Sequence, residues 1–502
     1  MRQLSGLDSA YLALDSATVA THLGCLCVID PPVHGPALSL QKLTELVASK
    51  LPLLPPFRRR LAEVPFGLDL PYWVEDPDFD VEFHLRELTL PAPGSERQLA
   101  AVVAGLHEQP LDRARPLWQI HLMHGLASGQ QAIYIKVHHA AIDGVAGSNL
   151  LVRLLDLAPQ PREAPVVDSW RPDTEPDALR LLARSVASAA RQPRRLARLC
   201  ADALRLLPEL VNSPAPRRFL APPTPFNKML GPRRRWAFGS LPMTRVKQVK
   251  NCAGVTVNDV VLALCAGALR RWLSDHHALP AGPLLAGVPV STRTHEHTAT
   301  EGNQLSKVIA PLPTHLRDPA ERLRAAHQAM GAAKEQFHAM PADVLTDIAE
   351  CTLPAVATLA SRLASRMRLL EHVRPLNLFV SNVPGRSVEM YIGGARLDAV
   401  YPLSTIADGQ GLNITVMGSF DALTIGILAD PEQVPDVQAL IDGIVDELDV
   451  LDVAVGSARS GRQMRRGPSR PEPSLTAVSS TAGGMPPDRA RRVSGGRRRP
   501  RQ

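Results

Sequence analysis

The chain has 502 residues, 45% hydrophobic and 21% charged, with a formal net charge of +7. This composition is that of a globular protein with a buried core, and it excludes disorder throughout the chain. The charge is uneven, because residues 456–502 hold 12 Arg against Glu472 and Asp488. Subtracting this surplus of +10 leaves about −3 for the rest of the chain. A mildly acidic body argues against a nucleic-acid-binding domain, which concentrates Lys and Arg on one folded face.

Targeting and membrane-spanning segments are not expected. Asp8 and Asp15 interrupt the N-terminal segment, which therefore lacks the apolar core of a signal peptide. The longest apolar runs, such as Val260–Leu269, fall short of the roughly 20 residues that span a bilayer. The six cysteines form no C-x-x-C pair and no zinc-ligand spacing. We therefore expect a reducing, cytoplasmic location and no metal site.

The length exceeds what one core usually supports, so we predict two domains, the first over residues 1–165. Within it, Gln131–Val137 alternates apolar and polar positions, which predicts a half-buried strand. This strand leads into His138, and the residues after Gly144 have a helical period. The segment between them is predicted to be a strand-to-helix turn, a common place for reactive side chains.

Residues 166–233 are predicted to be an Arg- and Pro-rich crossover linker, with Pro214, Pro216, Pro222, Pro223 and Pro225 at its exposed end. Within this linker, Leu179–Leu210 combines Leu with Arg. Such a stretch suits contact with a membrane or lipid-droplet surface, and it equally suits an amphipathic helix packed on the protein body.

Residues 234–455 are predicted to form the second domain. Thr256–Trp272 has a helical period, and the runs Leu412–Met417 and Leu423–Leu428 predict a strand pair. Beyond the second domain apolar residues become scarce, so residues 456–502 are predicted to form a disordered basic tail.

Two adjacent histidines carry the sharpest chemical signal. His138 and His139 open the pattern H-H-x-x-x-D-G, which ends at Asp143 and Gly144. A neutral imidazole can take the proton of an alcohol that attacks a thioester, a role worth about 100- to 10,000-fold in rate. Neighbouring residues on a strand point to opposite faces, so the two histidines are poorly placed to share a metal ion. The chain has no G-x-S-x-G elbow, which favours direct transfer over an acyl-serine intermediate.

Seven further blocks accompany this motif: Leu4–Asp8, Pro116–Trp118, Val257–Asp259, Pro289–Arg293, Gly302–Asn303, Ser381–Gly385 and Gly411–Thr415. Together with the histidine motif they resemble, in content and order, the bacterial wax ester synthase/diacylglycerol acyltransferase family of the CoA-dependent acyltransferase superfamily. The resemblance extends from residue 4 to about residue 455. Arg386 and the Arg-rich tail depart from the family pattern.

The resemblance implies an α/β fold of the chloramphenicol acetyltransferase type. Its two domains would each be built on a mixed sheet, with a tunnel between them and His139 at the middle. It also implies that His139 is the general base, accompanied by His138, and that Asp143 is structural and pairs with Arg293. From the residues alone, Asp143 could equally orient the imidazole. Gly144 would let the backbone turn tightly.

The reaction that the resemblance implies is transfer of a long-chain acyl group from acyl-CoA to diacylglycerol or to a long-chain alcohol. Acyl-CoA is a co-substrate, and no cofactor is expected. Burying a 16-carbon chain is favourable by on the order of 12 kcal/mol, so the substrates seek an apolar phase. We therefore expect a cytoplasmic protein in peripheral contact with the inner membrane or with lipid droplets.

Other residues are expected to support this site. Trp is commonly a core residue, so the block Pro116, Leu117 and Trp118 is predicted to be structural. Asn258 and Asp259 are predicted to cap the helix that follows them.

Two residues of the late strand pair are candidates for a catalytic donor. By superfamily analogy, Asn413 and Thr415 lie on the strand that could stabilise the tetrahedral oxyanion.

Three alternatives remain open from the sequence. A condensation domain of nonribosomal peptide synthesis shares the histidine motif but normally adjoins a carrier domain, which this chain lacks. An acyltransferase for a different hydroxyl acceptor would have the same motif. A catalytically silent protein could retain the fold and coat a lipid droplet or membrane surface through its Arg-rich segments.

Overall fold

The computed structural model describes residues 1–31, 36–142, 152–160, 168, 170–174, 176–189, 220–291, 305–339, 354–368, 371, 373–385, 388–419 and 421–465. Residues 1–457 form one compact unit, which contains both large β-sheets, and residues 458–502 form a second unit. The last helix, α14, runs over Val437–Arg465. Residues 456–465 are therefore helical, contrary to the predicted start of a disordered tail at residue 456.

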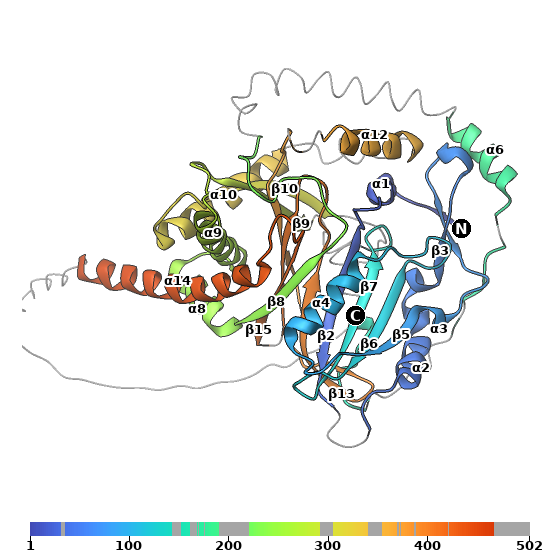
Figure 1. The fold of residues 1–502 in the computed structure, drawn as a ribbon, viewed down its shortest axis with the longest axis horizontal. Coiled ribbons are helices and arrows are strands. Elements are labelled where there is room, and N and C mark those ends of the chain that lie inside the picture. Colours follow the sequence, from blue (N-terminus) through green and yellow to red (C-terminus); the bar gives the residue numbers. More distant parts are fainter. Residues whose placement is uncertain are drawn as a thin grey trace, which may run out of the picture. The chain divides into compact units, whose positions relative to one another are not determined.

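The first large sheet has six strands in the order β12-β13-β2-β7-β6-β5 (Figure 1). It mixes one parallel pair, β5 with β6, with antiparallel neighbours. Its strands are β12 (Tyr391–Ile392), β13 (Ala395–Leu403), β2 (His22–Ile29), β7 (Gln131–His138), β6 (Trp118–His124) and β5 (Leu85–Thr89).

The predicted strand at Gln131–Val137 is confirmed as β7, but all of its residues are buried. The prediction of a half-buried strand was wrong because both faces of this sheet are covered. Leu43 of α2 (Leu40–Lys50) packs in the core on one face. Val103 of α4 (Glu96–Glu108) packs in the core on the other face. The central position of β7 places the histidine motif at the end of a rigid, fully covered strand.

The second large sheet also has six strands, in the order β10-β9-β11-β14-β15-β8. Its strands are β10 (Leu305–Leu312), β9 (Leu284–Ser291), β11 (Leu378–Val383), β14 (Leu412–Gly418), β15 (Ala422–Ala429) and β8 (Arg235–Pro242). The neighbours β9, β11 and β14 are parallel and the other pairs antiparallel. The predicted strand pair is confirmed as β14 and β15, which pair from Leu412 with Ala429 to Gly418 with Leu423. The prediction of an α/β fold with two mixed sheets is thus confirmed.

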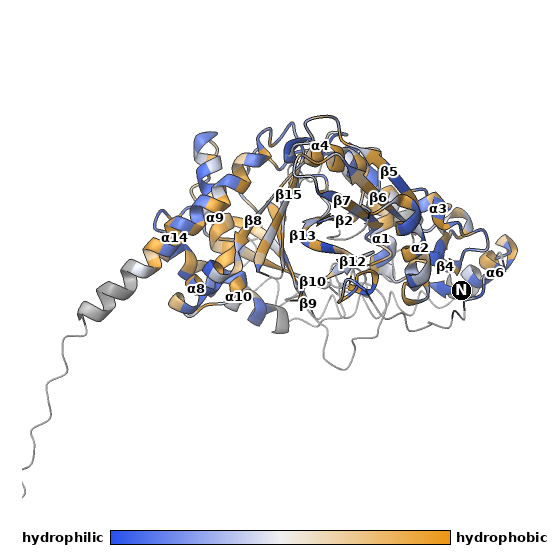
Figure 2. Ribbon diagram, turned by 90° about the horizontal axis from the view of Figure 1, so that it is seen from below, coloured by the Kyte–Doolittle hydropathy of each residue, from blue (hydrophilic) through white to orange (hydrophobic). Residues whose placement is uncertain are grey.

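Helices pack on the second sheet around the apolar α9 (Val257–Asp275), which Figure 2 shows largely in the hydrophobic colour. The helix begins one residue after Thr256, whose hydroxyl accepts the Asp259 N–H at 3.2 Å. The Asp259 carboxylate accepts the Thr256 N–H at 2.9 Å, which completes a capping box. Asp259 therefore helps to cap the helix as predicted, but the N-cap is Thr256 and not Asn258.

Among the described residues, α8 (Met243–Ala253), α10 (Pro319–Ala339) and α14 contribute to the same hydrophobic core as α9. By length and hydropathy, no single helix among the described residues could cross a membrane. The sharply bent pair of α8 and α9 passes such a test only jointly, with a bend of 102°. Most of α9 is buried in the core of this sheet, which explains its apolar composition.

One strand of the first sheet comes from the predicted second domain, and the sequence does not reveal this exchange. β13 follows β11 in the chain, inside the predicted second domain, yet it pairs with β2 of the first sheet. Where β13 passes β15, a Cβ added to Gly426 would lie 1.8 Å from the carbonyl oxygen of Pro402. A glycine is therefore required at this crossing.

Some described parts of the predicted linker pack on the body, whereas residues 177–180 are exposed. Trp170 donates from its indole N–H to Glu75 at 2.9 Å. Phe226 is fully buried, and the buried Asn227 donates to the carbonyl oxygens of Asn377 and Gly409. Of the prolines predicted at the exposed end, Pro223 is exposed and Pro222 and Pro225 are half-buried, whereas Pro214 and Pro216 lie outside the described residues. The residues after these prolines find core and hydrogen-bond partners.

The remaining elements lie around the first sheet and beside it. They are β1 (Arg2–Gln3), β4 (Tyr72–Glu75) and β3 (Arg59–Ala62) of a three-stranded sheet, α1 (Gly6–Leu14), α3 (Val81–His84), α6 (Ala178–Ala189), α12 (Pro354–Arg366), and the short turns η1 (Leu51–Leu53), η2 (Pro55–Arg58) and η3 (Pro65–Gly67).

Candidate active site

The backbone of the histidine motif is anchored on both sides. His138, the last residue of β7, donates its N–H to the carbonyl of Leu117 at 3.0 Å. His139 donates its N–H to the carbonyl of Thr21 at 2.8 Å. Thr21 directly precedes β2, and Leu117 directly precedes β6. The two neighbouring strands therefore fix the position at which both histidines leave the sheet.

Both ring nitrogens of His138 have partners. Nδ1 accepts the backbone N–H of Ala140 at 3.0 Å. Because Nδ1 accepts, the neutral ring carries its proton on Nε2, which lies 2.9 Å from Asp15 Oδ2 and 3.1 Å from Thr21 Oγ1. His138 is consequently held in one tautomer, and its hydrogen-bonding capacity is used inside the protein.

Asp15 lies in a small polar network with His138. Burial raises its pKa, but the hydrogen bonds from His138 and Thr21 outweigh burial and hold the pKa well below its usual range. The carboxylate also lies 3.2 Å from the guanidinium of Arg113. An ionised Asp15 therefore orients His138 from the end of α1.

His139 is 7% exposed and has a different environment. Its imidazole stacks on the ring of Tyr11, with centroids 3.8 Å apart and planes inclined by 11°. Tyr11 thus lies on α1, and Asp15 is the residue directly after it. Tyr11 contacts His139, whereas Asp15 contacts His138.

Tyr11, Asp15 and Thr21 are the site residues that the sequence did not predict. The only available signal was their place just after the block Leu4–Asp8, which forms the start of α1. Asp15 and His138 are 123 residues apart in the chain, so no local pattern connects them.

The block Pro116–Trp118, which was predicted to be structural, packs in the core beside the motif. Leu117 and Trp118 are buried, and the Trp118 ring is stacked between Phe57 and His84, each at 4.3 Å. Its indole N–H donates to the carbonyl of Phe57 at 2.9 Å. The block therefore supports the site by packing, and through the Leu117 carbonyl that receives the His138 N–H.

Asn413 and Thr415 lie on β14, and their side chains bond to one another: the Thr415 hydroxyl donates to Asn413 Oδ1 at 2.8 Å. The Asn413 amide donates to the carbonyl of Thr405 at 3.0 Å. Thr405 in turn donates its hydroxyl to the carbonyl of Ala20, next to Thr21. A chain of hydrogen bonds thus connects this strand to the surroundings of His138, while a role in oxyanion stabilisation stays a prediction.

The other predicted site residues are not brought to the motif by the described contacts. Asp259 is buried at the start of α9 and bonds to His327 Nδ1 at 2.8 Å, and Asn258 lies beside it. Asp143, Gly144 and Arg293 lie outside the described residues. The pairing of Asp143 with Arg293, the tight turn at Gly144 and the tunnel around His139 stay predictions.

Behind the motif, the first sheet contains further buried titratable side chains. Burial and the nearby Lys136 lower the pKa of His22 to about 3. Burial, and again Lys136, lowers the pKa of His121 to about 4. Lys136 is fully buried, and burial lowers its pKa to about 8, while its ammonium donates to the carbonyls of Leu106 and Gln109. The described residues include no group of three or more His, Cys, Asp or Glu that could hold a metal ion.

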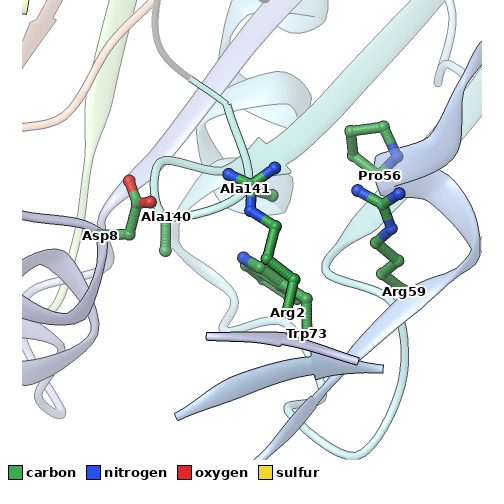
Figure 3. A pocket seen from close by; sticks show the side chains of 7 residues that line it. All are labelled: Arg2, Asp8, Pro56, Arg59, Trp73, Ala140 and Ala141. Atoms are coloured by element: carbon green, nitrogen blue, oxygen red, sulfur yellow. The ribbon is translucent and has the colours of Figure 1, made fainter. Parts of the chain in front are cut away.

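A small pocket of about 30 Å³ adjoins the motif (Figure 3). Ala140 and Ala141 line it, together with Asp8, Arg2 and Trp73, and Figure 3 shows the Arg2 side chain extending towards Ala141. A volume of this size holds one or two water molecules and no acyl chain. This pocket is therefore part of the support of the motif.

Comparison with known families agrees with the geometry. A family described as "Wax ester synthase/diacylglycerol acyltransferase catalytic domain" matches residues 4–261, and a "WS/DGAT C-terminal domain" matches residues 301–452. A Mycobacterium tuberculosis protein described as a "probable diacyglycerol O-acyltransferase" is 37% identical over 462 residues, which cover 89% of this chain and 98% of the relative.

Solved structures of acyltransferases and condensation domains have a similar fold. The wax ester synthase/diacylglycerol acyltransferase from Marinobacter aquaeolei VT8 is 29% identical with a TM-score of 0.67, over 91% of this chain and 100% of that one. The starter condensation domain of rhizomide synthetase has a TM-score of 0.52 at 16% identity, over 91% of this chain and 94% of its own. At that identity the likeness concerns the fold alone. These likenesses confirm the predicted two-domain acyltransferase fold.

Proposed function

Because the chain belongs to the wax ester synthase/diacylglycerol acyltransferase family, we propose that it transfers a long-chain acyl group from acyl-CoA to diacylglycerol or to a long-chain alcohol. The chain is an acyltransferase by family. The identity of the base and the contact with a lipid surface are the parts that the proposal adds.

One observation carries the assignment of the base. Nδ1 of His138 accepts a backbone N–H and Nε2 faces Asp15, so neither nitrogen of His138 is available to a substrate. His139 is held by stacking on Tyr11 and by a backbone hydrogen bond. These contacts favour His139 as the group that accepts the proton and His138 as the group that fixes the turn.

The proposed reaction is a direct transfer. The acceptor hydroxyl attacks the thioester carbonyl while its proton passes to the neutral His139 imidazole. The tetrahedral intermediate collapses, the C–S bond breaks, and the imidazolium returns the proton to the CoA thiolate. The products are an ester and free CoA, so the balance requires no oxidant and no cofactor besides acyl-CoA.

We include in this proposal a peripheral contact with a lipid surface. Both the acceptor and the ester product carry long acyl chains, and each buried CH₂ is favourable by about 0.8 kcal/mol, so both partition into an apolar phase. An enzyme that draws its acceptor from that phase must approach its surface.

The test incubates the full chain with radiolabelled palmitoyl-CoA and either dioleoylglycerol or hexadecanol, followed by separation of neutral lipids. Labelled triacylglycerol or wax ester is expected, and their ratio gives the acceptor preference. His139→Ala should reduce the rate by about 100- to 10,000-fold. The control is His277→Asn, because His277 is an exposed residue after α9 with φ of 53°, a conformation that Asn tolerates.

Wild-type protein that releases no CoA and forms no ester with either acceptor would overturn the lipid acyltransferase proposal. A His139→Ala variant that remains folded and fully active would overturn the assignment of the base alone. The second outcome would leave the transfer reaction in place and direct attention to another proton acceptor.

A further inference from the structure

A pocket of about 650 Å³ lies on the side of α1 away from the histidine motif. Its walls include Leu12 of α1, Phe66 of η3, Arg113, and Leu359 and Arg362 of α12. This volume falls in the range of ligand-binding clefts, about 300–1,000 Å³. We call this feature the α12 pocket.

Two large apolar residues of the pocket wall, Phe66 and Leu359, are exposed to solvent, and so are Leu363 and Met367, which follow Leu359 in the sequence. Phe66 is 83% exposed, Leu359 67%, Met367 57% and Leu363 53%. Single exposed apolar residues are ordinary, but a group of this kind marks an interaction surface. Phe66 lies in η3, Leu359 and Leu363 lie in α12, and Met367 directly follows α12; η3 and α12 contact each other.

Phe66 is held in an unusual conformation. Its φ is 61° and its ψ is 9°, a left-handed conformation that is uncommon for a bulky residue. The strained backbone places a largely exposed aromatic ring at the wall of the pocket, where it gains little packing within the protein. This arrangement is understandable if the ring is buried in something else.

Basic side chains flank the same face. Arg362 and Arg366 are exposed on α12, next to Leu359 and Leu363 in its sequence. α6, which contacts η3, adds the exposed Leu179, Arg180 and Arg184. Of the acidic residues near this face, Glu63 is exposed and lies 3.6 Å from Arg113, Asp69 is 6% exposed, and Asp177 just before α6 is exposed. The accessible charge around the apolar residues is therefore mainly positive.

We propose that this face, formed by η3, α12 and the start of α6, docks on a lipid surface that carries anionic phospholipid headgroups. Apolar residues flanked by Arg are the composition of helices that lie in a membrane interface, with Leu and Phe among the acyl chains and Arg at the headgroups. On the basis of the proposed function, this face is also the side from which the lipid acceptor enters.

α1 connects this face to the base. Leu12 and Ala13 line the α12 pocket, and Tyr11 of the same helix stacks on His139. Arg113, another wall of the pocket, donates to the carbonyl of Leu12 at 2.6 Å and lies 3.2 Å from Asp15. A lipid surface docked at the pocket is thus separated from the histidine motif by this single helix and its polar contacts.

The first test measures co-sedimentation of the full chain with vesicles of phosphatidylcholine mixed with phosphatidylglycerol, and with vesicles of phosphatidylcholine alone. Wild type should prefer the anionic vesicles and lose affinity at high salt. Combined Phe66→Asp and Leu359→Asp substitutions should weaken binding by about tenfold or more. Leu359→Ser with Leu363→Ser is a milder second variant. Val453→Asp on α14 is the control, since Val453 is 69% exposed there.

The second test separates docking from catalysis. Transfer from palmitoyl-CoA is measured to dioleoylglycerol held in the anionic vesicles, and to a short, water-soluble alcohol. The Phe66 and Leu359 variants should lose transfer to the vesicle-borne acceptor while keeping transfer to the soluble alcohol. Equal loss with both acceptors would indicate damage to the site and would overturn the role of this face in acceptor entry.

Failure of the docking inference and failure of the proposed function give different results. If wild type makes no ester with either acceptor yet binds anionic vesicles through this face, only the proposed function fails. If wild type does not sediment with the vesicles, or all variants sediment as it does, docking at this face is overturned. Binding that requires another protein in place of lipid would appear as such a failure.

Discussion

The phenol ring of Tyr11 lies flat against the imidazole of His139, with the two centroids 3.8 Å apart. One face of the imidazole is therefore covered, and the orientation of its ring edge is set by a residue on α1. Since Leu12 and Ala13 of α1 also line the α12 pocket, the residue that orients the base belongs to a helix that forms one wall of this pocket.

Replacing Tyr11 tests this orientation. Tyr11→Phe keeps the ring and should retain most activity, whereas Tyr11→Leu should lower kcat by about tenfold or more, because small misplacements of a catalytic group are costly. An aromatic face also stabilises an imidazolium by about 0.5–2 kcal/mol, so its loss should lower the apparent pKa in the pH–rate profile. A Tyr11→Leu variant with a reduced melting temperature but an unchanged kcat and profile would assign Tyr11 a packing role only.

Asp15→Asn tests the positioning of His138. An amide oxygen can still accept from Nε2, but the charge that favours this tautomer and pairs with Arg113 is lost. We expect a decrease in kcat of about tenfold, with the KM for acyl-CoA nearly unchanged. Asp15→Ala should cost more, since it removes the acceptor as well. Comparison with Asp30→Asn, whose carboxylate pairs with the exposed Arg396, controls for loss of an ion pair elsewhere. Equal kcat in wild type and both Asp15 variants would contradict a positioning role.

The parts of the fold that the sequence predicted are those set by local periodicity. β7, β14, β15 and α9 each have an apolar pattern that is sufficient by itself, and the motif follows directly from the end of β7. The family blocks identified the positions that carry the resemblance but did not say which atoms are in contact.

The parts that could not be predicted depend on contacts between distant segments. Asp15 and His138 meet because β2 and β7 pair, so that the residues just before β2 reach the end of β7. β13 has no sequence feature that assigns it to the first sheet in place of the second. The burial of Phe226 depends in the same way on a core formed by β-strands and helices far along the chain.

Trp118 is expected to be a large contributor to stability beside the site. It is 1% exposed and stacked on both faces, so Trp118→Ala should lower the free energy of unfolding by about 3–5 kcal/mol. Trp118→Phe keeps the stacking but leaves the Phe57 carbonyl without its indole donor, at a cost of about 1–3 kcal/mol. Urea unfolding measures both values. A change below about 1 kcal/mol for Trp118→Ala would contradict the structural assignment of this block.

Gly426 tests the crossing of β13 over β15. Because an added methyl group would meet the carbonyl oxygen of Pro402 at 1.8 Å, Gly426→Ala should destabilise the fold by about 1–3 kcal/mol or more. The matched control is Gly105→Ala in α4, where no atom lies within 4 Å of the added Cβ. There the gain in helix propensity should stabilise by about 0.5–1 kcal/mol. Similar melting temperatures for both variants would show that β13 and β15 are not so close.

The buried histidines of the first sheet predict a loss of stability in mild acid. The pKa of His22 is lowered to about 3 and that of His121 to about 4, mainly by burial, whereas an unfolded histidine titrates near 6.5. As the pH falls below about 6.5, the unfolded chain binds protons that the folded chain does not, so the free energy of unfolding decreases. At pH 5 the decrease should be about 2 kcal/mol for each such histidine.

His121→Leu isolates one of these groups. Nε2 of His121 has no hydrogen-bond partner among the described residues, so the substitution leaves no buried polar group unsatisfied. Urea unfolding at pH 7 and at pH 5 should show a loss of stability that is smaller in His121→Leu than in wild type by about 2 kcal/mol. The exposed control His277→Asn should lose as much as wild type. If His121→Leu loses as much as wild type too, His121 is protonated in the folded protein at pH 5, and water or a carboxylate must reach it inside the sheet.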